Sequence, residues 1–181
     1  MKLTKEDIKR HLEIWDFDLD KINIDLVEYV DMGEYKIANK DKPLLLVDNL
    51  QVCVSLFAYQ SNFGFASHIN TKVMVKDDYY LNEQGFPIKL KRIEDLYEAI
   101  INSNINFNES LNICLSFGYT PLPKDYPSIS LIYKAIDELK EKLNSKGITK
   151  INIIEINAPE FILDTLSSKI ILPTNRIKQR K

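Results

Sequence analysis

The sequence predicts a single α+β domain in which a mixed β-sheet carries two main helices on one face. Its 181 residues fit one domain of the usual size of about 100–200 residues. Apolar runs of strand length dominate the first half, a helix–strand–helix pattern follows, and short strand-like runs close the chain. With 45% hydrophobic and 28% charged residues, such a chain can bury a core without disulfides.

The first thirty residues are predicted to form a helical extension (1–30) ahead of the main domain (31–173). Thr4 is a typical N-cap and precedes an acidic first turn. Ile8, Leu12 and Trp15, spaced by four and three positions, lie on one stripe of a helix over residues 5–15. His11 lies off that stripe, so we expect it at the surface.

The next part of the chain is predicted to be mostly β-structure. Residues 26–38 have a strand-like pattern, and residues 44–47 are wholly apolar, as in a strand buried on both faces. Two further strands, 50–58 and 63–70, flank a short polar turn and are predicted to form a hairpin. Residues 71–90 contain Asp, Asn, Gly and Pro and are predicted to be a long loop.

The second half of the chain supplies the two main helices. Residues 93–101 have an amphipathic pattern, and residues 131–146 have the clearest helical periodicity in the chain, ended by Gly147. Between them, residues 111–117 are predicted to be a buried strand. Three short strands are expected at the end: 151–156, 161–164 and 169–172.

The charge balance excludes several classes of partner. The chain has 24 Lys and Arg against 26 Asp and Glu, a net charge of −2, which gives no long-range attraction to nucleic acid. The basic residues at the end lie in a tail, 174–181, that we expect to be disordered. No apolar run approaches the roughly 18–20 residues of a membrane span, and no secretion signal precedes the first helix. The sequence therefore predicts a cytoplasmic protein that is not membrane-embedded.

The two cysteines, Cys53 and Cys114, are too few for a disulfide framework or a metal cage. Both lie in apolar stretches, as small buried thiols do in a reducing compartment. No cofactor and no metal ion are expected. Cys114 has apolar neighbours and no His near it in sequence, so we interpret it as structural.

Cys53 and His68 are the candidate catalytic pair. If the hairpin closes over residues 60–61, or over residues 59–62, the two are directly opposed and share a face, with Cβ atoms roughly 4.5–5.5 Å apart. The other face of the hairpin is almost wholly apolar and is predicted to be core. The shared face carries mostly small or polar side chains, which can line a cleft: Gln51, Cys53, Ser55, Gly64, Ala66, His68 and Asn70.

A thiol beside an imidazole has a recognisable chemistry. The imidazolium stabilises the thiolate, which is the nucleophile, and the ring then carries protons to the leaving group. Single Cys and His residues on neighbouring strands also occur without catalysis. A purely structural role for Cys53 and His68 therefore stays open at this point.

The order of motifs resembles that of CheD, a family of bacterial chemoreceptor glutamine deamidases. The family carries a Leu-Gly-Ser-Cys-Val motif and then a Gly followed closely by an Ala–His pair. Leu50, Cys53 and Val54 match the first motif, and Gly64, Ala66 and His68 follow it. The likeness covers most of residues 33–173 and includes the long helix ending in Gly147-Ile148.

The resemblance implies a protein-glutamine deamidase of a chemotaxis system that needs no cofactor. Cys53 is then the nucleophile and His68 the proton carrier, while backbone N–H groups at Val52 and Cys53 form an oxyanion hole. Gln51 or Asn70 would orient His68. The implied partners are a substrate protein, such as a chemoreceptor, and a CheC-type phosphatase.

Three departures from the family pattern leave alternatives open. Gln51 and Val52 replace the Gly-Ser before the cysteine, Val47 stands where the family has a helper Thr, and the Leu-Pro after the His is absent. A gapless alignment anchored on His68 puts Gln51 at the nucleophile position. The alternatives are therefore a catalytically inactive CheD-like protein-binding domain, or an unrelated α+β domain.

Overall fold

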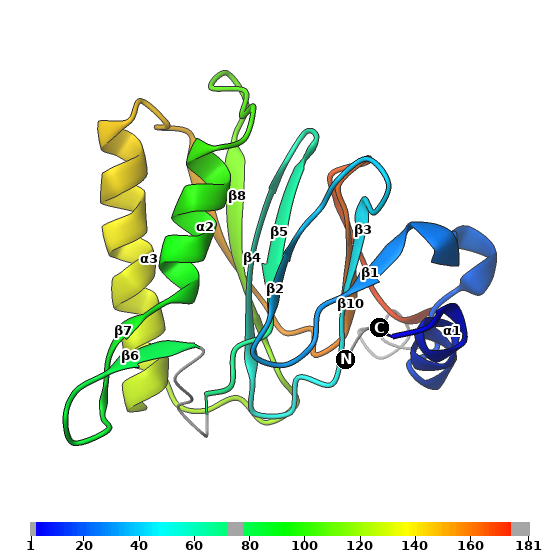
Figure 1. The fold of residues 1–181 in the computed structure, drawn as a ribbon, viewed down its shortest axis with the longest axis horizontal. Coiled ribbons are helices and arrows are strands. Elements are labelled where there is room, and N and C mark those ends of the chain that lie inside the picture. The colour runs from blue at the N-terminus through cyan, green and yellow to red at the C-terminus, as the bar shows by residue number, and fades with distance from the viewer. Residues whose placement is uncertain (1–2, 72–77, 175–181) are drawn as a thin grey trace, which may run out of the picture.

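The chain folds into four layers, described for residues 3–71 and 78–174 of a computed structural model (Figure 1). Helices α2 (Arg92–Ile101) and α3 (Pro127–Ser145) cover one face of a five-stranded sheet. A four-stranded sheet covers the other face, and α1 (Lys5–Ile14) packs on the outer side of that second sheet. The α+β class and the placement of two main helices on one face are thus confirmed.

The five-stranded sheet is mixed, as the sequence predicted. Among its described strands, only β8 (Leu111–Phe117) and β9 (Ile151–Ile156) are paired in parallel. The helix α3 connects these two strands as a crossover. Each other neighbouring pair is antiparallel. The strands lie in the order β2 (Tyr35–Ile37), β5 (Phe63–Ser67), β4 (Val54–Gln60), β8 (Leu111–Phe117) and β9 (Ile151–Ile156).

The second sheet gathers strands from the two ends of the chain. Residues 44–47 form a strand with every side chain buried, because the five-stranded sheet packs on one of its faces and the α1 layer on the other. The strands lie in the order β1 (Val27–Tyr29), β3 (Leu44–Val47), β10 (Phe161–Asp164) and β11 (Lys169–Ile171). β1 runs parallel to β3, and the other pairs are antiparallel.

The N-terminal segment is packed against this sheet. Thr4 and Asp7 form a capping box at the start of α1, as the Thr–acidic pattern predicts. Ile8 and Leu12 are buried in one cluster with Leu44 and Leu46 of β3. Two short 3₁₀ turns, Leu19–Lys21 and Ile24–Leu26, then lead into β1.

The predicted loop over residues 71–90 contains a hairpin, so that prediction is wrong for its second half. Strands β6 (Tyr79–Leu81) and β7 (Pro87–Leu90) pair antiparallel. The Asn82 side chain accepts hydrogen bonds from the backbone N–H groups of Gln84 and Phe86, and the turn residue Gly85 has φ +81°. Asn82 and Gly85 are among the residues that suggested a loop. Residues 72–77 lie outside the described part.

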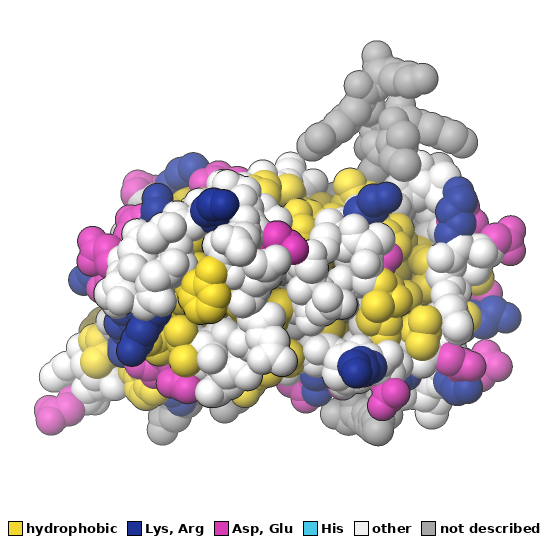
Figure 2. Space-filling model, turned by 90° about the horizontal axis from the view of Figure 1, so that it is seen from above, with side chains coloured by type: hydrophobic (Ala, Val, Ile, Leu, Met, Phe, Trp, Pro, Cys, Tyr) yellow, Lys and Arg dark blue, Asp and Glu magenta, His cyan; other side chains and the backbone are white. Residues whose placement is uncertain are grey.

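α3 begins at Pro127, four residues before the predicted start, with the proline in the first turn, where its missing N–H is tolerated. No helix in residues 3–71 and 78–174 combines the length and the apolar character needed to cross a membrane. Figure 2 shows Lys and Arg side chains interspersed with Asp and Glu over one face of the molecule. The predicted disordered tail lies almost wholly in residues 175–181, outside the described residues.

Candidate functional site

The β4–β5 hairpin closes one position later than predicted. Its turn is Ser61 and Asn62, with Gln60 paired to Phe63, and Asn62 takes the left-handed conformation at φ +62°. A bridge between Val54 and Ile69 continues the same register. Asn70 is therefore in register with Cys53, and Ser55 is in register with His68. The prediction that Cys53 and His68 are directly opposed is therefore wrong.

The even length of the turn keeps Cys53 and His68 on one face, but as diagonal neighbours. Diagonal positions in an antiparallel pair lie roughly 7–8 Å apart, against roughly 4.5–5.5 Å for direct partners. The thiol is a short side chain, so the added separation matters. No hydrogen bond joins Cys53 and His68 in the part of the chain that the structure describes.

The second sheet covers the shared face, so the predicted cleft is wrong. Cys53 belongs to a buried cluster with Leu45, Val47 and Phe161 of that sheet. Among the small residues that suggested a cleft, Gly64 lies at a close contact between the two sheets. A Cβ on Gly64 would overlap the Thr165 side chain at the end of β10. Cys53 is 7% exposed and His68 is 4% exposed.

The surroundings of Cys53 favour the neutral thiol. Burial raises the pKa of the thiol, and the negative charge of Asp78 raises the same pKa further. A backbone hydrogen bond from Thr71 opposes both effects without cancelling them. Burial alone raises the pKa of Cys114 to about 12, in keeping with the predicted structural role of that residue.

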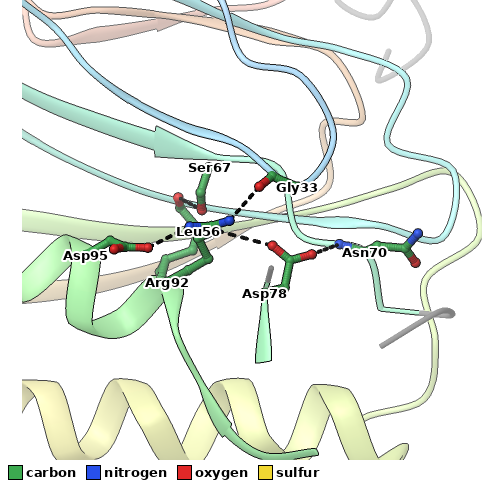
Figure 3. A network of polar contacts seen from close by, with 7 residues as sticks. All are labelled: Gly33, Leu56, Ser67, Asn70, Asp78, Arg92 and Asp95. Atoms are coloured by element: carbon green, nitrogen blue, oxygen red, sulfur yellow. Dashed lines mark hydrogen bonds and ion pairs between the residues drawn. The ribbon is translucent and has the colours of Figure 1, made fainter. Parts of the chain in front are cut away.

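Asp78 is held in place by the polar network drawn in Figure 3. Arg92, at the start of α2, donates to Asp78 Oδ1 at 3.2 Å, to Asp95 Oδ2 at 2.7 Å and to the carbonyl of Gly33. The backbone N–H of Asn70 donates to Asp78 Oδ2 at 3.0 Å. The carboxylate that opposes thiolate formation at Cys53 is therefore a fixed part of the fold.

His68 is also neutral at pH 7. Burial lowers the pKa of its ring to about 4, although the carboxylates of Asp48 and Asp31 and the nearby Val30 carbonyl favour the charged form. Neither ring nitrogen makes a hydrogen bond to a described residue. A neutral ring beside a neutral thiol is the reverse of the thiolate–imidazolium pair that nucleophilic catalysis uses.

The loop that carries the other predicted site residues is clamped by backbone bonds. Hydrogen bonds to Leu50 O, Gln51 O and Cys53 O come from the backbone N–H groups of Tyr119, Thr120 and Gly118, respectively, and the Thr71 hydroxyl donates to Val52 O. The Gln51 side chain is exposed, whereas His68 is buried. Asn70 directs its amide to the Met32 sulfur at 3.5 Å.

A second polar centre was missed by the sequence reasoning. Asp48, at the end of β3, is 0% exposed, and its carboxylate accepts from Trp15 Nε1 at 3.0 Å and from the Tyr29 hydroxyl at 2.9 Å. His11 Nδ1 lies 2.5 Å from Asp48 Oδ2. His11 is thus partly exposed, as expected, and is also paired with a buried carboxylate, which the sequence did not indicate. The one signal available beforehand was an acidic residue directly after a fully buried strand.

The described residues contain no group of three or more His, Cys, Asp or Glu side chains placed to hold a metal ion. No protein-family model and no curated protein sequence matches the chain. The site therefore has to be interpreted from its own geometry.

Proposed function

We propose that this chain is a non-catalytic protein-binding domain, the alternative that the resemblance to CheD offers beside the deamidase. The observation that supports this proposal is the cover over the Cys53–His68 face. A nucleophilic cysteine must reach its substrate and form a thiolate. Here the thiol lies between two packed sheets, and its pKa is raised.

The proposal is tested by the rate at which Cys53 reacts with iodoacetamide at pH 7. We expect alkylation of the native Cys114→Ala variant to be slower than that of glutathione by on the order of tenfold or more, because burial disfavours the reactive thiolate. The Cys53→Ala variant, which keeps the fully buried Cys114, is the matched control. Both variants should react fully in guanidinium chloride. Fast alkylation of native Cys53 would contradict the proposal.

The deamidase remains a second candidate, favoured by one observation. Cys53 and His68 share a face of the sheet. In that mechanism His68 takes the proton of the Cys53 thiol as the sulfur attacks a glutamine carboxamide carbon. The ring then gives this proton to the carboxamide nitrogen, which leaves as ammonia when the C–N bond breaks. Water then hydrolyses the thioester to leave glutamate and the free thiol. The two sheets would have to part for a substrate to enter.

Ammonia release from a glutamine-containing chemoreceptor fragment separates the two candidates. The binding proposal expects no release above the background of the Cys53→Ser variant. The deamidase expects release that Cys53→Ser abolishes and Cys114→Ala leaves unchanged.

A further inference from the structure

The open edges of the two sheets border a groove on one side of the molecule. β3 packs on β5, so their outer neighbours β1 and β2 are edge strands on the same side. A groove of about 560 Å³ lies there, lined by residues of β1, of β2 and of the turn before β3. Its apolar part is formed by Leu3, Ile8, Val27 and Tyr29.

The groove has a negative rim. Glu28, Asp31, Glu34 and Asp41 line it together with two lysines, Lys36 and Lys42. Lys36 is paired with Glu34 at 3.0 Å. The Lys42 ammonium donates to the backbone carbonyls of Asp25 and Val27 at 2.8 and 3.2 Å, which also occupies part of the β1 edge. The carboxylates of the lining outnumber its ammonium groups, so the net charge of the groove is negative.

The edge of β2 has backbone groups that point away from its only partner in the described sheet. The Ala38 N–H donates to Gly64, and the Glu34 carbonyl accepts from His68, so the even-numbered residues face β5. Backbone groups alternate in direction along a strand. Those of Tyr35 and Ile37 therefore point outward. These two residues are 37% and 44% exposed.

The two sides of an added strand would meet different surroundings. The Lys36 side chain lines the acidic groove, whereas the Tyr35 ring stacks on Phe65 on the helix side of the sheet, with ring centroids 5.3 Å apart. Side chains of an added strand alternate in the same way. One set would face the carboxylates of the groove, and the other would lie beside the apolar Tyr35 and Ile37.

We propose that the open edge of β2 binds an extended segment of a partner protein in which Lys or Arg alternates with apolar residues. This inference rests on the binding function proposed above and names the kind of partner segment. The backbone of the segment pairs with Tyr35 and Ile37 and extends the five-stranded sheet. Its basic side chains enter the groove, where charge complementarity selects them.

Fluorescence anisotropy with a labelled Lys-Val-Lys-Val-Lys-Val-Lys peptide and the full chain tests this. We expect saturable binding that weakens with added salt, and binding of the Glu-Val counterpart at least about tenfold weaker. Two further peptides are compared, one N-methylated at the Lys amides and the other at the Val amides. Only one of them should lose binding, because only one edge of the peptide pairs with β2. Equal binding by these two peptides would overturn the inference.

Variants of the chain locate the site. Ile37→Pro removes an outward N–H and leaves the hydrogen bonds to β5, so it should abolish peptide binding with an unchanged circular dichroism spectrum. Glu28→Lys and Asp41→Lys should each weaken binding by about three- to tenfold. Glu138→Lys is the matched control, because Glu138 lines a separate groove between α2 and α3. Equal weakening by the control would contradict the assignment.

Sedimentation of the chain without peptide tests the other occupant, a second copy. Self-association that Ile37→Pro abolishes would overturn the proposal of a partner segment. Cys53-dependent ammonia release, measured separately, would overturn the non-catalytic function, whereas failure of the peptide tests overturns this inference alone.

Discussion

His68 carries an imidazole in a place where water cannot solvate its charged form. Burial lowers the pKa of the ring to about 4, from an ordinary value of 6.5. The folded chain therefore binds a proton at His68 more weakly than the unfolded chain does. A group with a lowered folded pKa contributes stability above its unfolded pKa and loses it as the pH falls through the folded value.

The first prediction follows from this difference. Between pH 7 and pH 4, protonation of His68 in the unfolded state should reduce the free energy of unfolding by about 3 kcal/mol. The His68→Gln variant lacks this titration, so its loss of stability over the same range should be smaller by about that amount. Urea unfolding at a series of pH values measures both. Parallel pH profiles for the two proteins would show that His68 is not a buried neutral ring.

Asp48 differs from His68, because its buried carboxylate has several hydrogen-bond partners. His11, Trp15 and Tyr29 all direct polar atoms at it. Asp48→Ala should lower the free energy of unfolding by about 3 kcal/mol, because it removes a buried acceptor and leaves its donors unsatisfied. Tyr29→Phe removes one donor and should lower it by about 1 kcal/mol.

Trp15 gives a direct signal for the same change, since it is the only tryptophan in the sequence. Its native emission should shift to the red in Asp48→Ala, because the indole N–H that loses its carboxylate partner binds water instead. An unshifted spectrum together with a loss of stability below about 1 kcal/mol would show that the Asp48 centre does not hold α1 in place.

The contact between the end of β8 and residues 50–53 depends on one glycine. A Cβ on Gly118 would overlap the carbonyl oxygens of Leu50 and Gln51, which are backbone atoms and cannot rotate away. Gly118→Ala should therefore separate residues 118–120 from residues 50–53, to whose carbonyls their backbone N–H groups donate. We expect a loss of about 3 kcal/mol of stability and faster alkylation of Cys53 than in the native chain.

Gly85→Ala is the matched control for this element. Gly85 has φ +81° in the β6–β7 turn with open space around it, so alanine there meets only backbone strain of about 1–2 kcal/mol. Alkylation of Cys53 should be unaffected. Equal effects of the two substitutions would show that the Gly118 contact has no special role in covering the thiol.

The hairpin illustrates which part of an element can be predicted from local sequence. The two strands and the parity that puts Cys53 and His68 on one face follow from alternation along residues 50–70. The register does not, because Gln60, Ser61 and Asn62 are all acceptable turn residues, and the choice depends on the left-handed conformation of Asn62. The side chains that cover the thiol come from residues 44–47 and 161–164, and no local sequence pattern predicts that these strands pack on the hairpin.

At the scale of the molecule, the sequence predicted the helices and their common face but one sheet instead of two stacked sheets. The sequence of an apolar strand does not indicate which sheet the strand joins. Here β3 pairs with β1 and with β10, which come from other parts of the chain. The paired hairpin β6–β7 was missed because its polar turn dominates the local pattern. The assignment of strands to sheets therefore depends on long-range pairing, which local periodicity does not predict.

The last prediction concerns how the N-terminal layer unfolds relative to the rest. Ile8 and Leu12 of α1 share a buried cluster with Leu44 and Leu46, so the layer completes the core of the second sheet. Urea unfolding followed by Trp15 fluorescence should therefore coincide with unfolding followed by far-ultraviolet circular dichroism, which reports mainly on α2 and α3. Leu12→Ala should move both midpoints down together, by about 2–4 kcal/mol in the free energy of unfolding. Ile14→Ala, on the exposed side of the same helix, should change them by less than about 0.5 kcal/mol. An earlier transition seen by Trp15 alone would mean that residues 1–30 unfold as a separate extension.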